Sequence, residues 1–131
     1  MASTATSRRS VLTWLSFAVA GGVLAQASLA GLFLSGTGAA RGIHLILGWL
    51  LPLFALSLPV AAVIERRRGR ASRGLVAAAS VLPFVLWVQE ALGHIPEPVT
   101  TAVHVPLGVS LLTYSVLLGL AASTPRGAGS G

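Results

Sequence analysis

Four long apolar segments, separated by short polar connections, make up most of the chain. None of them carries a charge near its middle, and Glu90 lies toward the end of the third. Each has the roughly 20 residues that a helix needs to cross a bilayer, where only helices satisfy every backbone group of a single segment. The pattern predicts an all-α, integral membrane four-helix bundle over residues 11–122, with polar tails at 1–10 and 123–131. The predicted helices cover residues 11–34, 43–64, 74–93 and 99–122.

Composition supports a membrane location. Of the 131 residues, 54% are hydrophobic and only 9% are charged, whereas roughly a quarter of a soluble domain is charged. The chain has no cysteine, which excludes disulfides, thiolate metal ligands and covalent haem attachment. The formal charge of +6 would suggest nucleic acid. The arginines cluster at the ends of the apolar segments, however, which indicates a role in membrane topology and excludes a nucleic-acid partner.

The distribution of arginine predicts the orientation. Eight of the nine arginines fall on one side of the predicted bundle and only Arg41 falls on the other. Because basic residues are retained on the cytoplasmic side, we expect both termini in the cytoplasm of a bacterium and four crossings of its inner membrane. The connections 35–41 and 94–98 then face outward. The eight are Arg8, Arg9, Arg66, Arg67, Arg68, Arg70, Arg73 and Arg126.

A cleaved export signal is an alternative interpretation of the first segment. Arg8 and Arg9 form an arginine pair before it, and Ala25-Gln26-Ala27 has the small-x-small form of a cleavage site. The apolar run nevertheless continues to Leu34. That length exceeds a signal core and favours a permanent helix.

The two halves of the chain share a short pattern: a glutamine, a turn, then His-x-x-x-Gly. The glutamine and histidine are 18 residues apart in the first half and 15 in the second. A unit of two helices returns to the side where it began, so the halves are predicted to be parallel repeats about an axis along the membrane normal. Chance similarity is the alternative. The matched residues are Gln26, His44 and Gly48, then Gln89, His104 and Gly108.

The two histidines predict a haem site. Polar side chains are costly within lipid and tend to be functional or to face the bundle interior. In a simple ring of four helices the second and fourth are diagonal, so His44 and His104 are expected to face each other across the centre. Two neutral imidazoles approaching one iron from opposite sides are the axial ligands of a b-type haem.

Other residues of the pattern are assigned supporting roles in this site. Gly48 and Gly108 follow their histidines by four residues, on the same helix face, and would leave room for the macrocycle. Gln26 and Gln89 could orient a histidine or bind a haem propionate. Arg41, alone at the outer end, is a further propionate partner.

Two alternatives to haem stay open at this level. The histidines could simply form hydrogen bonds that hold the helices together. A metal-ion or proton-handling cluster could instead form from His44, His94, His104 and Glu90 at the outer end, although it has too few carboxylates for a hard cation. Glu90 is expected to point to a different face from Gln89, and His94 to be a solvated residue of the outer loop.

The repeated Gln and His-x-x-x-Gly pattern resembles a group of small, uncharacterised four-helix bacterial membrane proteins, over about residues 11–122. More distantly it resembles one four-helix half of haem A synthase and the cytochromes of the b561 type. That resemblance implies haem held by bundle histidines, with only His44 and His104 matching the ligands. The chain lacks the histidines for a second haem and an acidic residue beside His44, so haem A synthesis is not implied.

The sequence thus predicts a membrane-embedded b-type cytochrome-like protein. His44 and His104 would bind haem b, and electrons would pass near the outer face to or from quinone or a redox partner protein, in a monomer or an oligomer. The alternative is a small structural or accessory membrane subunit without a cofactor. A transporter-like protein is disfavoured because the inner half of the bundle has only isolated serine and threonine residues.

Overall fold

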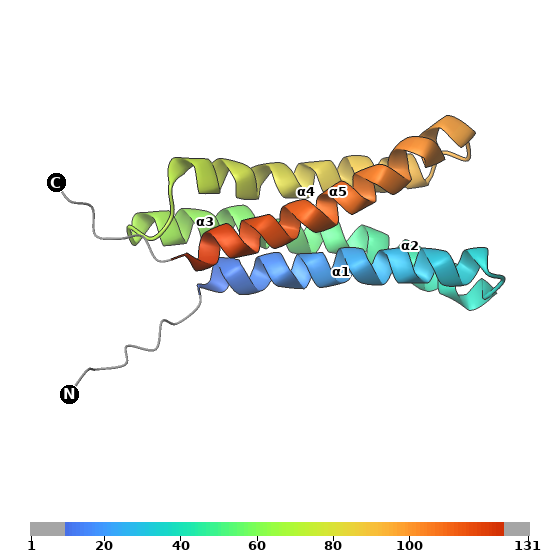
Figure 1. Ribbon diagram of the computed structural model, residues 1–131, viewed down its shortest axis with the longest axis horizontal. Helices are drawn as coiled ribbons and strands as arrows, with labels where there is room; N and C mark the ends of the chain where they lie inside the picture. Colours follow the sequence, from blue (N-terminus) through green and yellow to red (C-terminus); the bar gives the residue numbers. More distant parts are fainter. Residues whose placement is uncertain (1–9, 125–131) are drawn as a thin grey trace.

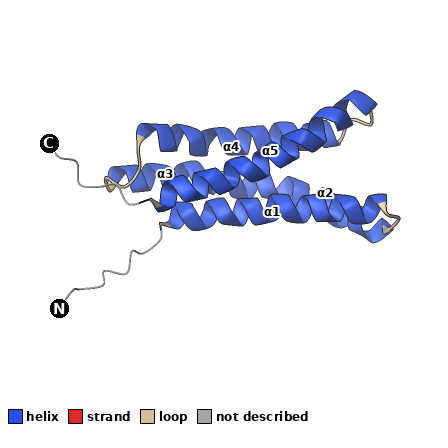
Figure 2. Ribbon diagram, viewed as in Figure 1, coloured by secondary structure: helices blue, strands red, loops and turns tan. Residues whose placement is uncertain are grey.

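The computed structural model describes residues 10–124, and within that range the chain forms helices and no strand (Figure 2). Arg8, Arg9 and Arg126 lie outside the described residues. Four stretches are long and apolar enough to cross a membrane, and the second of them, Gly38–Arg67, contains two helices. The prediction of an all-helical chain with four membrane-length segments is therefore confirmed. The helices are α1 Val11–Leu34, α2 Gly38–Ala55, α3 Ser57–Arg67, α4 Arg73–Gly93 and α5 Pro98–Ser123.

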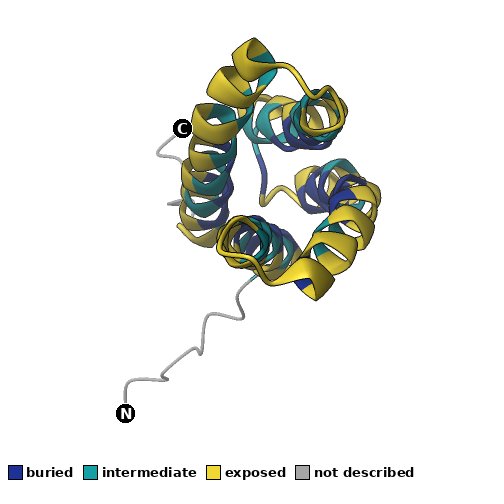
Figure 3. Cartoon of the chain, turned by 90° about the vertical axis from the view of Figure 1, so that its right-hand side faces the viewer, coloured by how far each residue is buried: buried dark blue, intermediate teal, exposed yellow. Residues whose placement is uncertain are grey.

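The helices form an antiparallel ring (Figures 1 and 3). In ring order, α1 packs against α2 and α3, these pack against α4, α4 packs against α5, and α5 returns to α1. The Cα traces of α1 and α4 nowhere come within 8 Å, and neither do those of α2 and α5. These two pairs are therefore the diagonals of the ring, as expected for a simple up-and-down bundle.

The second membrane-length segment differs from its predicted bounds of 43–64. It begins at Gly38, so Arg41 lies in the first turn of α2 and the connection shrinks to residues 35–37. It is also interrupted at Leu56, whose N–H bonds the Leu53 carbonyl at 3.2 Å in a tightened turn. Pro59 explains the interruption, because it has no N–H to donate to the carbonyl four residues earlier.

Polar contacts close the end of the bundle that holds the α3–α4 connection. Ser10 and Ser72 cap α1 and α4 there, each accepting a backbone N–H, at 3.1 and 3.0 Å respectively. Glu65 is 3% exposed and accepts hydrogen bonds from Nε and Nη2 of Arg70, the latter at 3.0 Å. Hydrogen bonding to this carboxylate raises the pKa of Arg70 above its ordinary value, so the pair stays charged.

The apolar core runs along the axis of the ring, where the buried residues of neighbouring helices face one another (Figure 3). Leu12, Leu58 and Leu82 are fully buried there. A Cβ on Gly119 would lie 3.1 Å from the Phe17 ring, so the absence of a side chain lets α5 approach α1 closely. Large apolar residues such as Val81 and Phe84 point outward instead, which suits a surface that faces lipid.

We expect Leu82→Ala to destabilise the bundle and Val81→Ala to leave it nearly unchanged. Leu82 is 1% exposed and its neighbour Val81 is 49% exposed. Truncating the buried side chain leaves a cavity and should cost about 2–4 kcal/mol. Reversible unfolding in mixed micelles measures both free energies. Equal effects of the two substitutions would contradict the packing described here.

Candidate functional site

One cavity of about 370 Å³ lies in the half of the bundle farther from the arginine-rich connection. All four helices that reach this half contribute to its wall, and α4 and α5 diverge from α1 and α2 at this end (Figure 1). The predicted site residues other than Arg41 all line it. They are Gln26 on α1, His44 and Gly48 on α2, Gln89 on α4, and His104 and Gly108 on α5.

His44 is held by the backbone of the neighbouring helix. Its Nδ1 lies 3.0 Å from the carbonyl oxygen of Gln26. A carbonyl only accepts hydrogen bonds, so Nδ1 carries the proton and Nε2 of the neutral ring keeps a free lone pair. The ring of Phe33 meets the imidazole edge-on, with centroids 5.4 Å apart, and fixes the ring plane further.

His104 is held in the same way on the other side of the ring. Its Nδ1 donates to the carbonyl oxygen of Gln89 at 2.9 Å. In return, the Gln89 side-chain amide donates to the carbonyl oxygen of His104 at 2.9 Å, and the same Nε2 lies 3.3 Å from His104 Nε2. These contacts join α4 to α5 and again leave Nε2 as the basic nitrogen of the imidazole.

Two buried acceptors border the cavity without a partner. They are the side-chain oxygens Oε1 of Gln26 and Gln89, and no other buried side-chain nitrogen or oxygen between residues 10 and 124 lacks one. An unsatisfied buried group of this kind costs about 1–3 kcal/mol. The cavity wall therefore offers polar atoms that a bound molecule could satisfy.

The two imidazoles sit on diagonal helices, and both border the same cavity. The more exposed part of the cavity wall comes from α1 and α5 and is entirely apolar. A molecule in this cavity would thus meet polar groups on the inside and an apolar opening toward the surrounding lipid. The exposed wall residues are Ala27, Gly31, Leu34, Val105 and Val109.

Glu90 faces a different helix from Gln89, as expected, because its carboxylate lies beside Gly48 of α2 whereas Gln89 bonds His104 of α5. Both side chains nevertheless belong to the site. Glu90 lines the same cavity as Gln89, because the cavity is wide enough to receive two consecutive residues of α4. Its carboxylate fills the space beside Gly48, and a Cβ on Gly108 would lie 3.1 Å from Gln89 Nε2. The two glycines therefore provide room for these side chains, a contact that the sequence pattern did not reveal.

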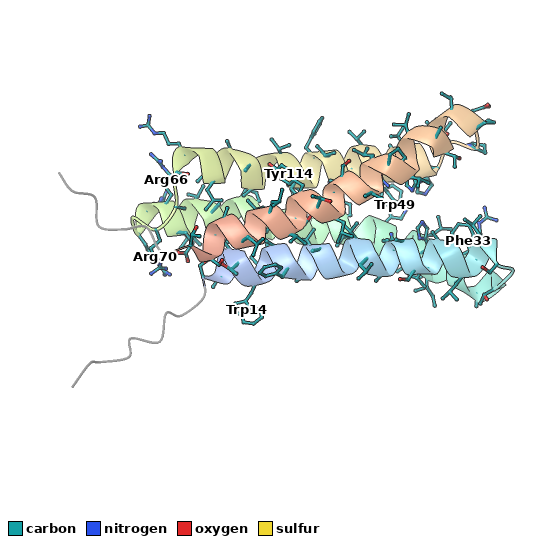
Figure 4. The ribbon with its side chains drawn as sticks, in the orientation of Figure 1. Trp14, Phe33, Trp49, Arg66, Arg70 and Tyr114 are labelled. Atoms are coloured by element: carbon teal, nitrogen blue, oxygen red, sulfur yellow. The ribbon has the colours of Figure 1, made fainter. Side chains whose placement is uncertain are left out.

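Arg41 and His94 lie outside the cavity wall. Arg41 is exposed on the first turn of α2, at the same end of the bundle as the cavity. His94 is 41% exposed in its side chain, lies 3.5 Å from a Glu90 oxygen, and packs on the Trp49 ring at 5.4 Å. Figure 4 shows Phe33 and Trp49 toward this end and Arg66 and Arg70 at the other.

The aromatic neighbours are contacts that sequence reasoning missed. Trp49 and Trp87 meet edge-on, with centroids 5.6 Å apart, between α2 and α4. The sequence shows only that each tryptophan lies near polar residues of its own segment, which could have hinted at a packing role but not at a contact between the two rings. Across residues 10–124, no group of three or more His, Asp or Glu side chains is arranged to hold a metal ion. The structure gives no support to the metal-ion cluster of His44, His94, His104 and Glu90.

We expect the neutral forms of His44 and His104 to carry their proton on Nδ1, because each Nδ1 faces a carbonyl oxygen. The isotropic ¹⁵N shifts of histidine-labelled protein in micelles report the tautomer directly. Spectra of His44→Asn and His104→Asn assign the two signals. An Nε2–H tautomer at either residue would contradict the hydrogen bonds described.

No protein-family model matches the chain, and comparisons with curated proteins and with solved structures give no significant match. The chemistry of the cavity therefore has to be inferred from its own residues. Those residues are two imidazoles that each keep an Nε2 lone pair, one of them in contact with the Gln89 amide, two glutamine amides and one carboxylate, around a cavity whose exposed wall is apolar.

Proposed function

We propose that the protein binds one b-type haem in this cavity, with His44 and His104 as the axial ligands. The proposal rests on the fact that the two histidines have the same hydrogen-bonding arrangement. Each comes from one of two diagonal helices and gives Nδ1–H to a backbone carbonyl, and both line one cavity. A second-nitrogen hydrogen bond of this kind is typical of metal-binding histidine, because it fixes the ring and raises the basicity of Nε2.

The cavity suits a flat, mostly apolar molecule. Its exposed wall is formed by small and aliphatic residues of α1 and α5, which match the hydrocarbon edge of a macrocycle. Iron ligation requires His104 Nε2 to leave the Gln89 amide, to which it is joined only by a long contact of 3.3 Å. The shorter bond from that amide to the His104 carbonyl, at 2.9 Å, can persist and keep the helix in place.

Supporting roles follow for the other residues of the site. The side-chain oxygen of Gln26 is buried and has no partner, so a half-turn of the amide would direct its NH₂ group toward a propionate. Arg41 lies three residues before His44 and thus on a neighbouring part of the α2 surface. Its exposed guanidinium is suited to pair with a propionate at the outer end. Rotation of Glu90 and Gln89 would clear the space beside Gly48 and Gly108.

Electron transfer is the activity that this site supports. When bound, haem supplies a one-electron carrier. The protein holds both imidazoles through backbone carbonyls, and two fixed ligands favour electron transfer over oxygen chemistry. The apolar opening toward lipid suits a quinone as the redox partner, and the short connections at this end suit a partner protein.

The proposal includes the internal repeat and the orientation. In both halves a histidine donates to the carbonyl of the matched glutamine, which supports two parallel repeats. The described arginines gather at one end of the bundle, apart from Arg41 (Figure 4). This supports a bacterial inner-membrane location with the cavity near the outer face and both termini in the cytoplasm.

A structural or accessory subunit is the second candidate. The reciprocal bonds between Gln89 and His104 pin α4 to α5 without any ligand, which is what a purely structural role would require. In that case the protein should be colourless and should co-purify with a larger membrane complex.

The haem proposal predicts a b-type reduced-minus-oxidised absorbance spectrum for protein produced with ample haem supply. His44→Ala and His104→Ala should each lose or shift this spectrum and weaken haem binding by at least about tenfold, since one iron bond is removed. His94→Ala is the matched control, because His94 lies outside the cavity, and it should keep the wild-type spectrum. Wild-type protein that folds and binds no haem would overturn the proposal in favour of the structural role.

The orientation can be tested separately, because the chain has no cysteine of its own. Thr37→Cys and Arg68→Cys place single thiols at exposed positions at opposite ends of the bundle. In spheroplasts, which have an intact inner membrane but no outer envelope, a membrane-impermeant maleimide should label the cysteine of Thr37→Cys within minutes. It should label the cysteine of Arg68→Cys only after the inner membrane is made permeable. The reverse pattern would contradict the proposed orientation.

A further inference from the structure

A second site is suggested by the surface between α4 and α5, toward the arginine-rich end of the bundle and away from the histidines. Two apolar depressions of about 390 and 110 Å³ lie between these helices, and Tyr114 borders both of them. From Gly74 to Val85 they follow about 16 Å of α4, at 1.5 Å per residue. One leaflet of a bilayer has a hydrocarbon thickness of about 15 Å. We call this surface the α4–α5 groove, lined by Gly74, Leu75, Val81, Val85, Tyr114 and Ala121.

Every side-chain hydroxyl in the groove already has a partner within the protein. Tyr114 donates from its hydroxyl on α5 to the Ala78 carbonyl of α4 at 3.0 Å. Ser72 accepts the Leu75 N–H as a helix cap, and Ser110 donates to the Pro106 carbonyl at 3.0 Å. The groove therefore has little to offer a polar ligand, and its walls suit a hydrocarbon chain.

The same groove ends at the most basic part of the described chain. Ser72 and Gly74, on either side of Arg73, line its end. Five arginines lie at this end of the bundle, and between residues 10 and 124 only Arg70 among them forms an ion pair, with Glu65. The others remain exposed and available to an anion. They are Arg66, Arg67, Arg68 and Arg73.

We propose that the α4–α5 groove is a binding site for an anionic glycerophospholipid, with one acyl chain in the groove and the phosphate against Arg73. The charge and the shape complement each other, since a cationic end adjoins two apolar depressions that together follow α4 over about the thickness of one leaflet. Arginine binds phosphate oxygens in bidentate geometry, and basic residues at a membrane surface favour anionic headgroups. The proposal does not depend on haem, because the groove and the histidine cavity are separate.

The test is native mass spectrometry of the full chain in mild detergent, with phosphatidylglycerol and phosphatidylcholine of identical acyl chains as probes. We expect a one-to-one adduct with phosphatidylglycerol, several times more abundant than with phosphatidylcholine. Arg73→Gln should lower this preference by about fivefold, the effect of one basic residue near an anionic surface. Arg73→Lys keeps the charge and should retain most of the preference.

A matched pair of substitutions tests the groove itself. Ala121→Phe fills the groove from α5, whereas Ala77→Phe adds the same ring at an exposed position of α4 outside it. We expect only the first to abolish the one-to-one adduct, and Gly74→Leu, which narrows the groove from α4, to do the same. Circular dichroism establishes that each variant is folded.

Three results would overturn the proposal. The first is equal binding of the two lipids, which is what a nonspecific lipid annulus gives. The second is an unchanged adduct in both folded groove variants. The third is efficient competition by glycerol phosphate, which has the charged head without the chain and would show that the arginines act alone.

Discussion

The half of the bundle that holds the cavity depends on hydrogen bonds from histidine side chains to backbone carbonyls of a neighbouring helix. His44 donates to Gln26 and His104 to Gln89, at 3.0 and 2.9 Å. Because lipid tails are as apolar as the helix surfaces, the hydrophobic effect does not drive helices together within a bilayer. Polar contacts and close packing must therefore hold them. At this end α4 and α5 diverge from α1 and α2 (Figure 1), and the two bonds tie each hairpin together on its own side of the cavity.

The same bonds determine what the site can do. A carbonyl partner places the proton on Nδ1, so that Nε2 of each ring keeps its lone pair as an acceptor, which in His104 receives the Gln89 amide at 3.3 Å. Structural support and ligand chemistry are thus served by opposite nitrogens of one ring. Burial of two unpartnered glutamine oxygens beside them gives the cavity a polar interior that packing alone would not produce.

The two ends of the bundle are built differently. At the arginine-rich end the core is closed by fully buried Leu12 and Leu58, by serine caps and by the Glu65–Arg70 pair. At the cavity end the polar residues are only partly buried, and the exposed wall is apolar. This asymmetry separates the proposed haem site, at one end of the bundle, from the proposed lipid site at the other.

The sequence by itself determined the helical class, the four membrane-length segments and which polar residues could matter, because segment length and the cost of burying polar groups in lipid are properties of composition and spacing. The bounds of α1, the diagonal arrangement and the convergence of Gln26, His44, Gln89 and His104 followed the predicted pattern. The tertiary structure alone decided the rest. Only packing shows that backbone carbonyls hold the histidines and that Glu90 fills the space beside Gly48. Only packing shows, too, that the segment containing Pro59 breaks at Leu56. Each of these features depends on which atoms of separate turns meet.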